Sequence, residues 1–226
     1  MKANQRRIGP DMLRDLVLRL KDTKVTPLPE LVISDAQFPD GINLVEADTP
    51  LVLKLLRINS TKAVNLERAR VQGRLTIEAA CLDEFLSYRA TFDDDLVLVG
   101  STFSNQVFLN EVTIGGLLDL QASTVGKLFM VHGSVTHTVT CADLKFSRSN
   151  DQNEINIDKS TIKGDLFLDD MKLQGAAVPH LVGEDHVSLS RLDIAGDLSM
   201  RGSTIFGPIN LSGTIVRDNA FLGGER

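Results

Sequence analysis

The sequence predicts an all-β protein: a right-handed, parallel, quadrilateral β-helix (a short-coil solenoid) with an N-terminal capping α-helix. Three observations lead to this fold class. Pairs of apolar residues recur every ten or eleven residues, glycine recurs at one place in the repeat, and aromatic residues make up only 5% of the 226 residues, with no tryptophan. Because compact globules use large rings to fill their centre, this scarcity favours a narrow core of aliphatic side chains.

The repeating unit joins two short apolar stretches. Residues 118–120 read Leu-Asp-Leu and residues 123–125 read Ser-Thr-Val, so the unit is Leu-x-Leu-x-x-small-x-aliphatic. Later units follow with one step of sixteen and one of twenty-one residues. Compact domains do not need such regularity, which is typical of solenoids. The first apolar positions of the regular units are Val64, Leu75, Phe85, Leu96, Val107, Leu118, Leu128 and Val139.

Each apolar pair predicts a very short strand, since alternation places both apolar side chains on one side and the middle residue on the other. Two units close one four-sided coil of about 21 residues. A lone coil cannot bury its apolar side, but a stack of coils buries a continuous core. Seven or eight coils at about 4.8 Å spacing give a rod roughly 35–40 Å long.

Glycine often stands two positions before the first apolar residue of a unit. At a recurring corner, glycine supplies backbone conformations that other residues avoid. We therefore expect such conformations at these glycines. They are Gly73, Gly116, Gly126, Gly164, Gly196 and Gly207.

Residues 141–146 read Cys-Ala-Asp-Leu-Lys-Phe, which resembles the small-Asp/Asn-Leu-polar phrasing of the pentapeptide-repeat family. The resemblance covers about residues 60–222 and implies four-sided, right-handed, parallel coils. Units of ten to eleven residues exceed two strict pentapeptides, and leucine often replaces the small residue, which indicates a divergent member. Members of such a family share a shape rather than one activity.

Before the repeat, residues 10–24 predict an amphipathic helix with Pro10 and Asp11 in its first turn. We expect it to cap the first coil, and a membrane-surface anchor is the alternative. Residues 30–60 are apolar but poorly periodic, so we divide the chain into a cap with irregular first coils (1–60) and a repeat domain (61–226). The helix face expected to be buried carries Met12, Leu13, Leu16, Val17 and Leu20.

Two segments interrupt the repeat. Residues 147–154 form a polar insertion, and residues 174–186 form a longer excursion that includes Pro179. Tolerated surface insertions and recognition loops are both compatible with them. The sequence stops within the repeat at residues 219–222, so the last coil has no cap. An open parallel edge invites pairing, which predicts a homodimer through this coil or a longer natural chain.

The net charge of −6 is unevenly distributed. Residues 1–74 carry 13 Lys/Arg and 9 Asp/Glu, whereas residues 75–226 carry 11 and 21, a net charge of −10. This acidic body argues against nucleic acid as a partner and is compatible with a basic protein surface. No apolar run approaches a membrane span and no secretory signal is evident, so we expect no membrane insertion and a cytoplasmic location.

Outward residues of successive coils suggest a contact surface. The middle positions Leu86, Phe108 and Phe129 are 22 and 21 residues apart, so they should stack on one outer face. We call these three residues the apolar ladder. Exposed apolar patches usually mark interfaces. The alternative is that residues 174–186 or the N-terminal segment cover the ladder.

No residue pattern predicts catalysis, a cofactor or a metal. Asp93, Asp94 and Asp95 make an acidic patch at a corner, which we interpret as solvated because a hard cation needs more converging oxygen ligands. Cys141 is expected to point inward, and Cys81 outward with no activating group nearby. Nucleotide-loop and nucleophile motifs are lacking. We therefore expect a protein that is not an enzyme.

The interpretation adopted is a non-catalytic protein-binding scaffold of the pentapeptide-repeat type, whose partner is unknown. The resemblance implies an alternative, because some pentapeptide-repeat proteins are similar to duplex DNA in width and charge and bind type II topoisomerases. A DNA-mimicking modulator of a type II topoisomerase would suit the acidic body. Interleaved acids and bases, and the basic cluster of Arg68, Arg70 and Arg74, speak against it.

Overall fold

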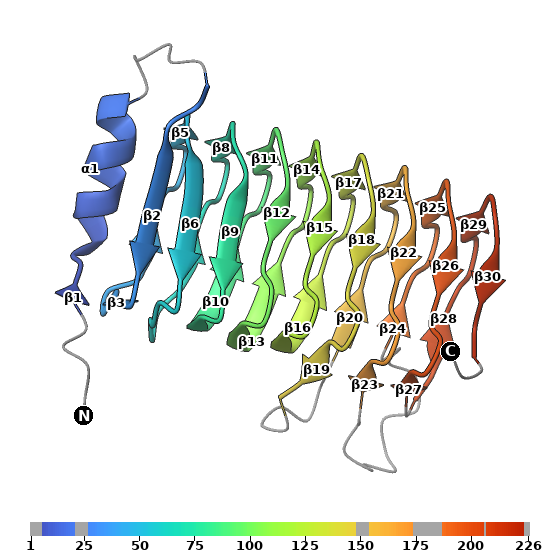
Figure 1. Ribbon diagram of the computed structural model, residues 1–226. Helices are drawn as coiled ribbons and strands as arrows, with labels where there is room; N and C mark the ends of the chain where they lie inside the picture. The colour runs from blue at the N-terminus through green and yellow to red at the C-terminus, as the bar shows by residue number, and fades with distance from the viewer. Residues whose placement is uncertain (1–5, 21–26, 148–153, 174–186, 206, 224–226) are drawn as a thin grey trace.

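The computed structural model describes residues 6–20, 27–147, 154–173, 187–205 and 207–223. Its chain winds into a parallel β-solenoid of eight stacked coils with one short helix at the N-terminal end (Figure 1). Every paired strand in the three large sheets is parallel to its neighbours, as the repeat predicts. The predicted all-β solenoid with an N-terminal helix is confirmed.

Three sheets form the sides of the solenoid, and a two-stranded sheet joins β1 (Arg6–Arg7) to β3 (Ala36–Gln37). The nine-stranded sheet contains β2 (Glu30–Ser34), β6 (Val52–Leu56), β9 (Leu75–Glu78), β12 (Leu96–Val97), β15 (Leu118–Asp119), β18 (Val139–Thr140), β22 (Leu166–Phe167), β26 (Leu198–Ser199) and β30 (Ala220–Phe221). The eight-stranded sheet contains β5 (Asp48–Thr49), β8 (Arg70–Val71), β11 (Thr91–Phe92), β14 (Thr113–Ile114), β17 (Ser134–Val135), β21 (Thr161–Ile162), β25 (Asp193–Ile194) and β29 (Ile215–Val216). The eleven-stranded sheet contains β4 (Ile42–Asn43), β7 (Val64–Asn65), β10 (Cys81–Leu86), β13 (Thr102–Phe108), β16 (Thr124–Phe129), β19 (Lys145–Phe146), β20 (Glu154–Asn156), β23 (Lys172–Leu173), β24 (Val187–Ser188), β27 (Thr204–Ile205) and β28 (Ile209–Asn210).

Three sheets cover four sides because the long strands bend around one corner. The pairing of β10 with β13 shifts register between Leu82 and Glu84, and the two ends of each strand lie on different sides of the coil. In later coils the same corner separates β19 from β20 and β23 from β24. In the sequence, the predicted insertion at 147–154 separates β19 from β20 and the predicted excursion at 174–186 separates β23 from β24. Residues 148–153 and 174–186 lie outside the described residues.

The repeat register places the predicted apolar positions in the core. Val64, Phe85 and Val107 pair in successive coils of one sheet, and Leu75 pairs with Leu96 in another. All five side chains are buried. The core is not purely aliphatic as expected, since Phe38, Phe85, Phe92 and Phe103 are also fully buried and Phe85 meets Phe103 edge-on at 6.3 Å between ring centroids. A coil of 21 or 22 residues is therefore wide enough for a ring.

The corner glycines have a different role from the one predicted. Of the six, only Gly207 has a left-handed φ. A Cβ at Gly73 would stand 2.8 Å from the Leu51 carbonyl oxygen, and one at Gly164 would stand 2.8 Å from the His137 carbonyl carbon. These glycines are needed because the backbone of the neighbouring coil passes close by.

Helix α1 (Pro10–Leu20) covers the first coil next to β4 and β5. Leu13 and Val17 are buried, and Arg14 Nη1 donates to the Val45 carbonyl oxygen at 2.9 Å. The predicted burial of Met12 and Leu16 is wrong, because Met12 is 67% exposed and Leu16 is also exposed. The core at the end of the first coil is narrow, so only one i, i+4 pair of the helix, Leu13 and Val17, packs on it. Residues 21–24 of the predicted helix lie outside the described residues.

Regular coils begin before residue 61. Strands β4, β5 and β6 already occupy the three sheets and pair with β7, β8 and β9. At the other end, β27 to β30 form the last edge of the sheets, and Ile209 and Leu222 are exposed there. Within the described residues, no helix has the length and apolar character required to cross a membrane.

Candidate protein-binding face

The apolar ladder lies where the spacing places it. Leu86 is opposite Phe108 across the β10–β13 pairing, and Phe108 is opposite Phe129 across β13–β16. The two phenylalanine rings meet edge-on with centroids 6.0 Å apart. All three side chains are half-buried, so each keeps an accessible surface on the outside of the rod.

In all the remaining coils that the structure describes, the residue at this outward position is polar. In four of them an asparagine Oδ1 accepts a hydrogen bond of 2.9 to 3.2 Å from the backbone N–H two residues later, which fixes the corner that follows. Leucine and phenylalanine cannot make this bond. The column runs Asn43, Asn65, Leu86, Phe108, Phe129, Asn156, Ser188 and Asn210. At these three positions the asparagine acceptor is replaced by accessible apolar surface, and in the Phe129 coil Asn110 Oδ1 of the preceding coil accepts the Val131 N–H instead, at 2.8 Å.

Tyr88 extends the ladder sideways, and the sequence prediction missed it. Its ring lies 6.5 Å from the Phe108 ring, and the Arg89 guanidinium lies over it at 4.8 Å. Its hydroxyl donates to Glu111 at 3.0 Å, and this bond raises the pKa of Tyr88. Tyr88 follows Leu86 by two residues, so strand alternation carried past the strand end could have found it.

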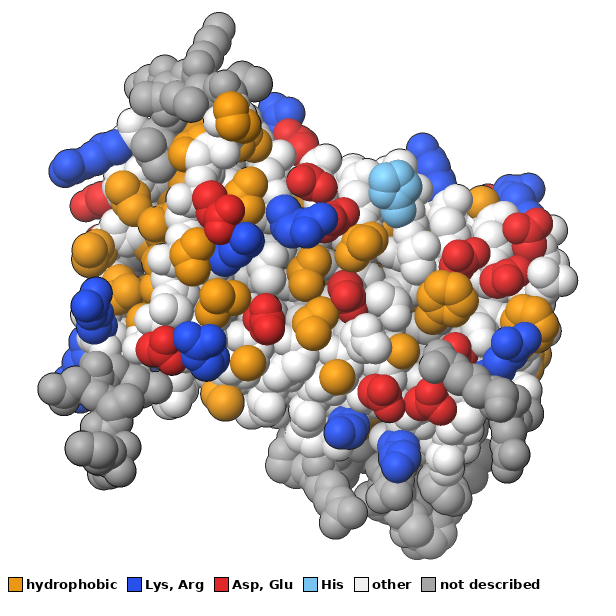
Figure 2. Space-filling view, viewed as in Figure 1, with side chains coloured by type: hydrophobic (Ala, Val, Ile, Leu, Met, Phe, Trp, Pro, Cys, Tyr) orange, Lys and Arg blue, Asp and Glu red, His pale blue; other side chains and the backbone are white. Residues whose placement is uncertain are grey.

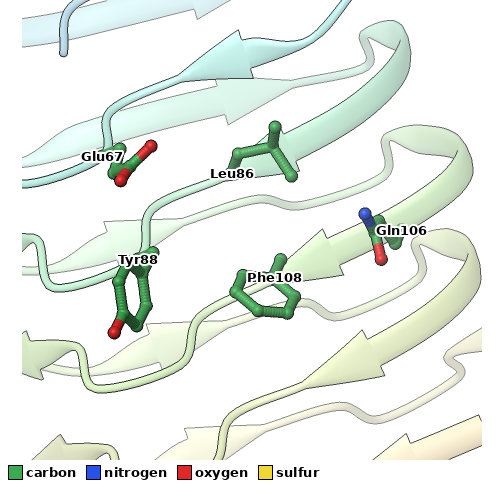
Figure 3. Close-up of a pocket in the computed structure, with 5 residues that line it drawn as sticks. All are labelled: Glu67, Leu86, Tyr88, Gln106 and Phe108. Atoms are coloured by element: carbon green, nitrogen blue, oxygen red, sulfur yellow. The ribbon is translucent and has the colours of Figure 1, made fainter.

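An open depression of about 330 Å³ lies among these side chains. Figure 3 shows Leu86, Tyr88 and Phe108 around its centre, with Glu67 at one side and Gln106 at the other. These residues come from three successive coils, so the depression exists only because the coils stack in register. Its surface is mainly apolar, with one carboxylate and one amide at its margins.

The predicted acidic patch is not a cluster of free carboxylates. It does lie at a corner, between β11 and β12, but Asp95 is buried rather than solvated. Asp95 forms an ion pair with Arg74 and accepts a hydrogen bond from Leu117 N at 3.0 Å. Asp93 pairs with Arg70 at 2.8 Å, which raises the pKa of that arginine.

Other carboxylates of the acidic body also bind the coils together. Asp165 accepts from the backbone N–H of Asp197 at 2.9 Å, and Asp197 in turn accepts from that of Asn219 at 2.9 Å. Asp158 and Asp169 each accept a backbone N–H 32 residues later at 2.8 Å. Figure 2 shows acidic and basic side chains interspersed over the face it presents. These four carboxylates therefore stabilise the stack of coils.

Cysteine and metal chemistry have little support. Cys81 is exposed and Cys141 is buried, as predicted. Burial raises the pKa of the Cys141 thiol to about 12, which suits an inert core residue. No group of three His, Cys, Asp or Glu side chains that could hold a metal ion occurs within the described parts of the chain.

Comparison with protein-family models, curated proteins and solved structures finds no match. The pentapeptide-repeat resemblance therefore remains a resemblance, carried by the repeat alone. The solenoid itself is compatible with a repeat-type scaffold. The partner must be inferred from the face that the coils present.

Proposed function

We propose that this protein is a non-catalytic scaffold that binds a protein partner through the apolar ladder and Tyr88. The single observation that carries the proposal is the replacement of a corner-forming asparagine by Leu86, Phe108 and Phe129 in three adjacent coils. Aromatic side chains that stand half-exposed on a rigid support are typical of interface centres.

A non-catalytic role suits the composition of this face. Its depression offers one carboxylate, one amide and three apolar or aromatic side chains. General acid–base or nucleophilic chemistry needs at least a paired donor and acceptor aimed at a common point. Such a set of residues is better suited to contact with the surface of another protein.

The DNA-mimic alternative needs a continuous row of free carboxylates. In the part of the chain that the structure describes, several acids pair with arginines of adjacent coils, as in Asp35 with Arg57 at 2.7 Å and Asp193 with Arg217 at 2.8 Å. Others accept backbone N–H groups. These pairings favour the scaffold over the topoisomerase modulator.

Affinity capture from a lysate of the source cells, compared across variants, tests the proposal. In Phe108→Asn/Phe129→Asn, loss of the half-buried ring surface costs about 1 kcal/mol per site. A corner hydrogen bond regained at position 108 offsets about the same, whereas at position 129 the Val131 N–H already bonds to Asn110 Oδ1, so the net cost is about 1 kcal/mol. The double variant should therefore fold. Phe167→Asn is the matched control, because Phe167 points outward from β22, opposite Thr140 on another side of the rod.

We expect a stoichiometric partner to be captured by the wild type and by Phe167→Asn, and lost with the double variant. Circular dichroism and thermal unfolding of all three proteins verify that the fold is intact. If the captured proteins are the same for all three, the ladder is not the contact surface and the proposal fails.

A further inference from the structure

The depression beside the apolar ladder pairs an apolar floor with one acidic margin. Leu86, Tyr88 and Phe108 supply the floor. Glu67 lies at one side, and its carboxylate faces the depression (Figure 3). Gln106 closes the opposite side. Its amide donates to Glu84 at 3.1 Å, which fixes its orientation.

Glu67 is less neutralised than Glu111, the acid that accepts from Tyr88. Its ion pair with Arg68 is long, at 3.8 Å, because Arg68 also pairs with Glu46 at 3.2 Å. By contrast, Glu111 accepts from Arg89 at 2.7 Å, and this bond holds its pKa below the usual value. The Glu67 side chain is 37% exposed, so its carboxylate is open to a further cation.

A purely apolar occupant would bind weakly in the depression, because it cannot compensate the charge of Glu67. Covering the depression removes water from the Glu67 carboxylate, and an uncompensated buried charge costs several kcal/mol. A cation carried by the occupant compensates that cost and adds specificity. The long stem of arginine or lysine is apolar and packs on hydrophobic surface while its charged end reaches a carboxylate.

The ring faces also favour a cation. Tyr88 already holds the Arg89 guanidinium over its ring at 4.8 Å. Phe108 meets Tyr88 and Phe129 in tilted and edge-on arrangements rather than in a face-to-face stack. Cations within about 6 Å of an aromatic face are attracted by its quadrupole. At long range, the chain's net charge of −6 attracts a basic segment.

We propose that the occupant is a basic segment of a protein partner, with an arginine or lysine beside an apolar residue. The basic side chain lies over Leu86 and Phe108 and meets Glu67, and the apolar residue packs on Phe129. This inference rests on the proposed scaffold function and adds the chemical class of the bound segment.

Selection from a phage-displayed library of random octapeptides tests it, with counter-selection on Phe108→Asn/Phe129→Asn. Enriched peptides are then synthesised with a fluorescein label, and their dissociation constants are measured by fluorescence anisotropy. We expect arginine or lysine next to an apolar residue. Glu67→Gln, or citrulline in place of the peptide arginine, should weaken binding about tenfold. Glu78→Gln, an exposed glutamate at the end of β9, is the matched control and should change it less than twofold.

The outcomes separate the two proposals. Peptides that need the ladder but carry no basic residue, or that bind Glu67→Gln as tightly as the wild type, overturn the basic-segment inference and leave the scaffold standing. Peptides that bind the double variant as well as the wild type, or no enrichment at all, overturn both. Raising the salt concentration gives a second readout, because binding through Glu67 should weaken with ionic strength.

Discussion

At two opposite corners of the coils, single residues adopt the left-handed conformation, and most of them are not glycine. Arg68, Arg89 and Glu111 occupy one such corner, and Ala79 and Ala122 occupy the other, all with φ between 52° and 56°. For a residue with a Cβ this conformation costs roughly 1 kcal/mol or more. The charged members form ion pairs between coils, as Arg89 does with Glu111. Alanine gains no such pair, so these corners carry uncompensated strain.

Ala122→Gly should therefore stabilise the protein. Removing the Cβ relieves the strained φ of 56°, and the greater freedom of glycine in the unfolded chain offsets only part of the gain. We expect a rise of about 0.5 kcal/mol in the free energy of unfolding, measured by urea denaturation. Gln121→Gly, next to it and not in the left-handed region, should lower stability instead. A loss of stability in Ala122→Gly would contradict the strain argument.

Asp119 gives a pH-dependent prediction. Burial raises its pKa, although the hydrogen bond it accepts from Gln121 N at 2.8 Å opposes the shift. A raised pKa in the folded state means that stability is greatest below the unfolded pKa of 3.8 and is lost as pH rises through the folded value. Asp119→Asn keeps the acceptor oxygen and removes the charge. Its gain should therefore grow from pH 3.5 to pH 7.

The size of that gain should be roughly a few tenths of a kcal/mol at pH 7, because Asp119 is only half-buried and water screens its charge. Urea denaturation at several pH values between 3.5 and 7 measures it. Asp193→Asn is a useful comparison, since it removes an ion pair with Arg217 at 2.8 Å and should not stabilise. A gain for Asp119→Asn that is the same at all pH values would contradict the assignment.

At the scale of the elements, the short strands could be predicted from the sequence and their corners could not. Alternation of apolar residues every two positions determines which side chains point inward, so Leu96 and Leu118 were placed correctly. Corner conformation depends on contacts with the next coil. From the sequence, Gly73 is interpreted as a turn residue. In the structure, glycine is needed there because a Cβ would clash with the Leu51 carbonyl oxygen of the preceding coil.

The helix shows the same limit. Its apolar stripe predicted a helix and a cap, yet α1 buries only Leu13 and Val17 among the predicted residues whose side chains are described. The periodicity of the sequence indicates how wide the apolar face of the helix is. How much of that face is buried depends on the width of the first coil on which the helix packs. Tyr88 was missed for a related reason: its neighbours on the face come from other coils.

The cap yields a prediction with an internal control. Val17→Ala removes fully buried methyl groups above the first coil and should cost about 1 kcal/mol or more. Leu16→Ala, one residue away but exposed, should cost less than about 0.5 kcal/mol. Hydrogen exchange should show faster amide exchange in β4 and β5 for Val17→Ala alone. Equal effects of the two variants would mean that α1 does not rest on Val17.

At the scale of the whole molecule, the two ends of the stack differ. The N-terminal coil is covered by α1, whereas the last described coil presents the edges of β27 to β30. Ile209 occupies a core position, opposite Val187, yet is 42% exposed, and Leu222 is 58% exposed. Open strand edges next to exposed core residues favour pairing with another chain. Two copies related by a two-fold axis would cover both edges at once.

For the 226-residue chain we therefore expect a dimer in solution that pairs through the last described coil. Light scattering coupled to size-exclusion chromatography should give twice the mass of the 24.7 kDa chain. Ile209→Lys should return the protein to a monomer, because it places a charge in the middle of the paired surface. Val32→Lys, at the opposite end of the rod where Val32 is 49% exposed, should leave the dimer intact. A wild-type monomer at micromolar concentration would show that exposed core residues of one coil do not suffice for pairing.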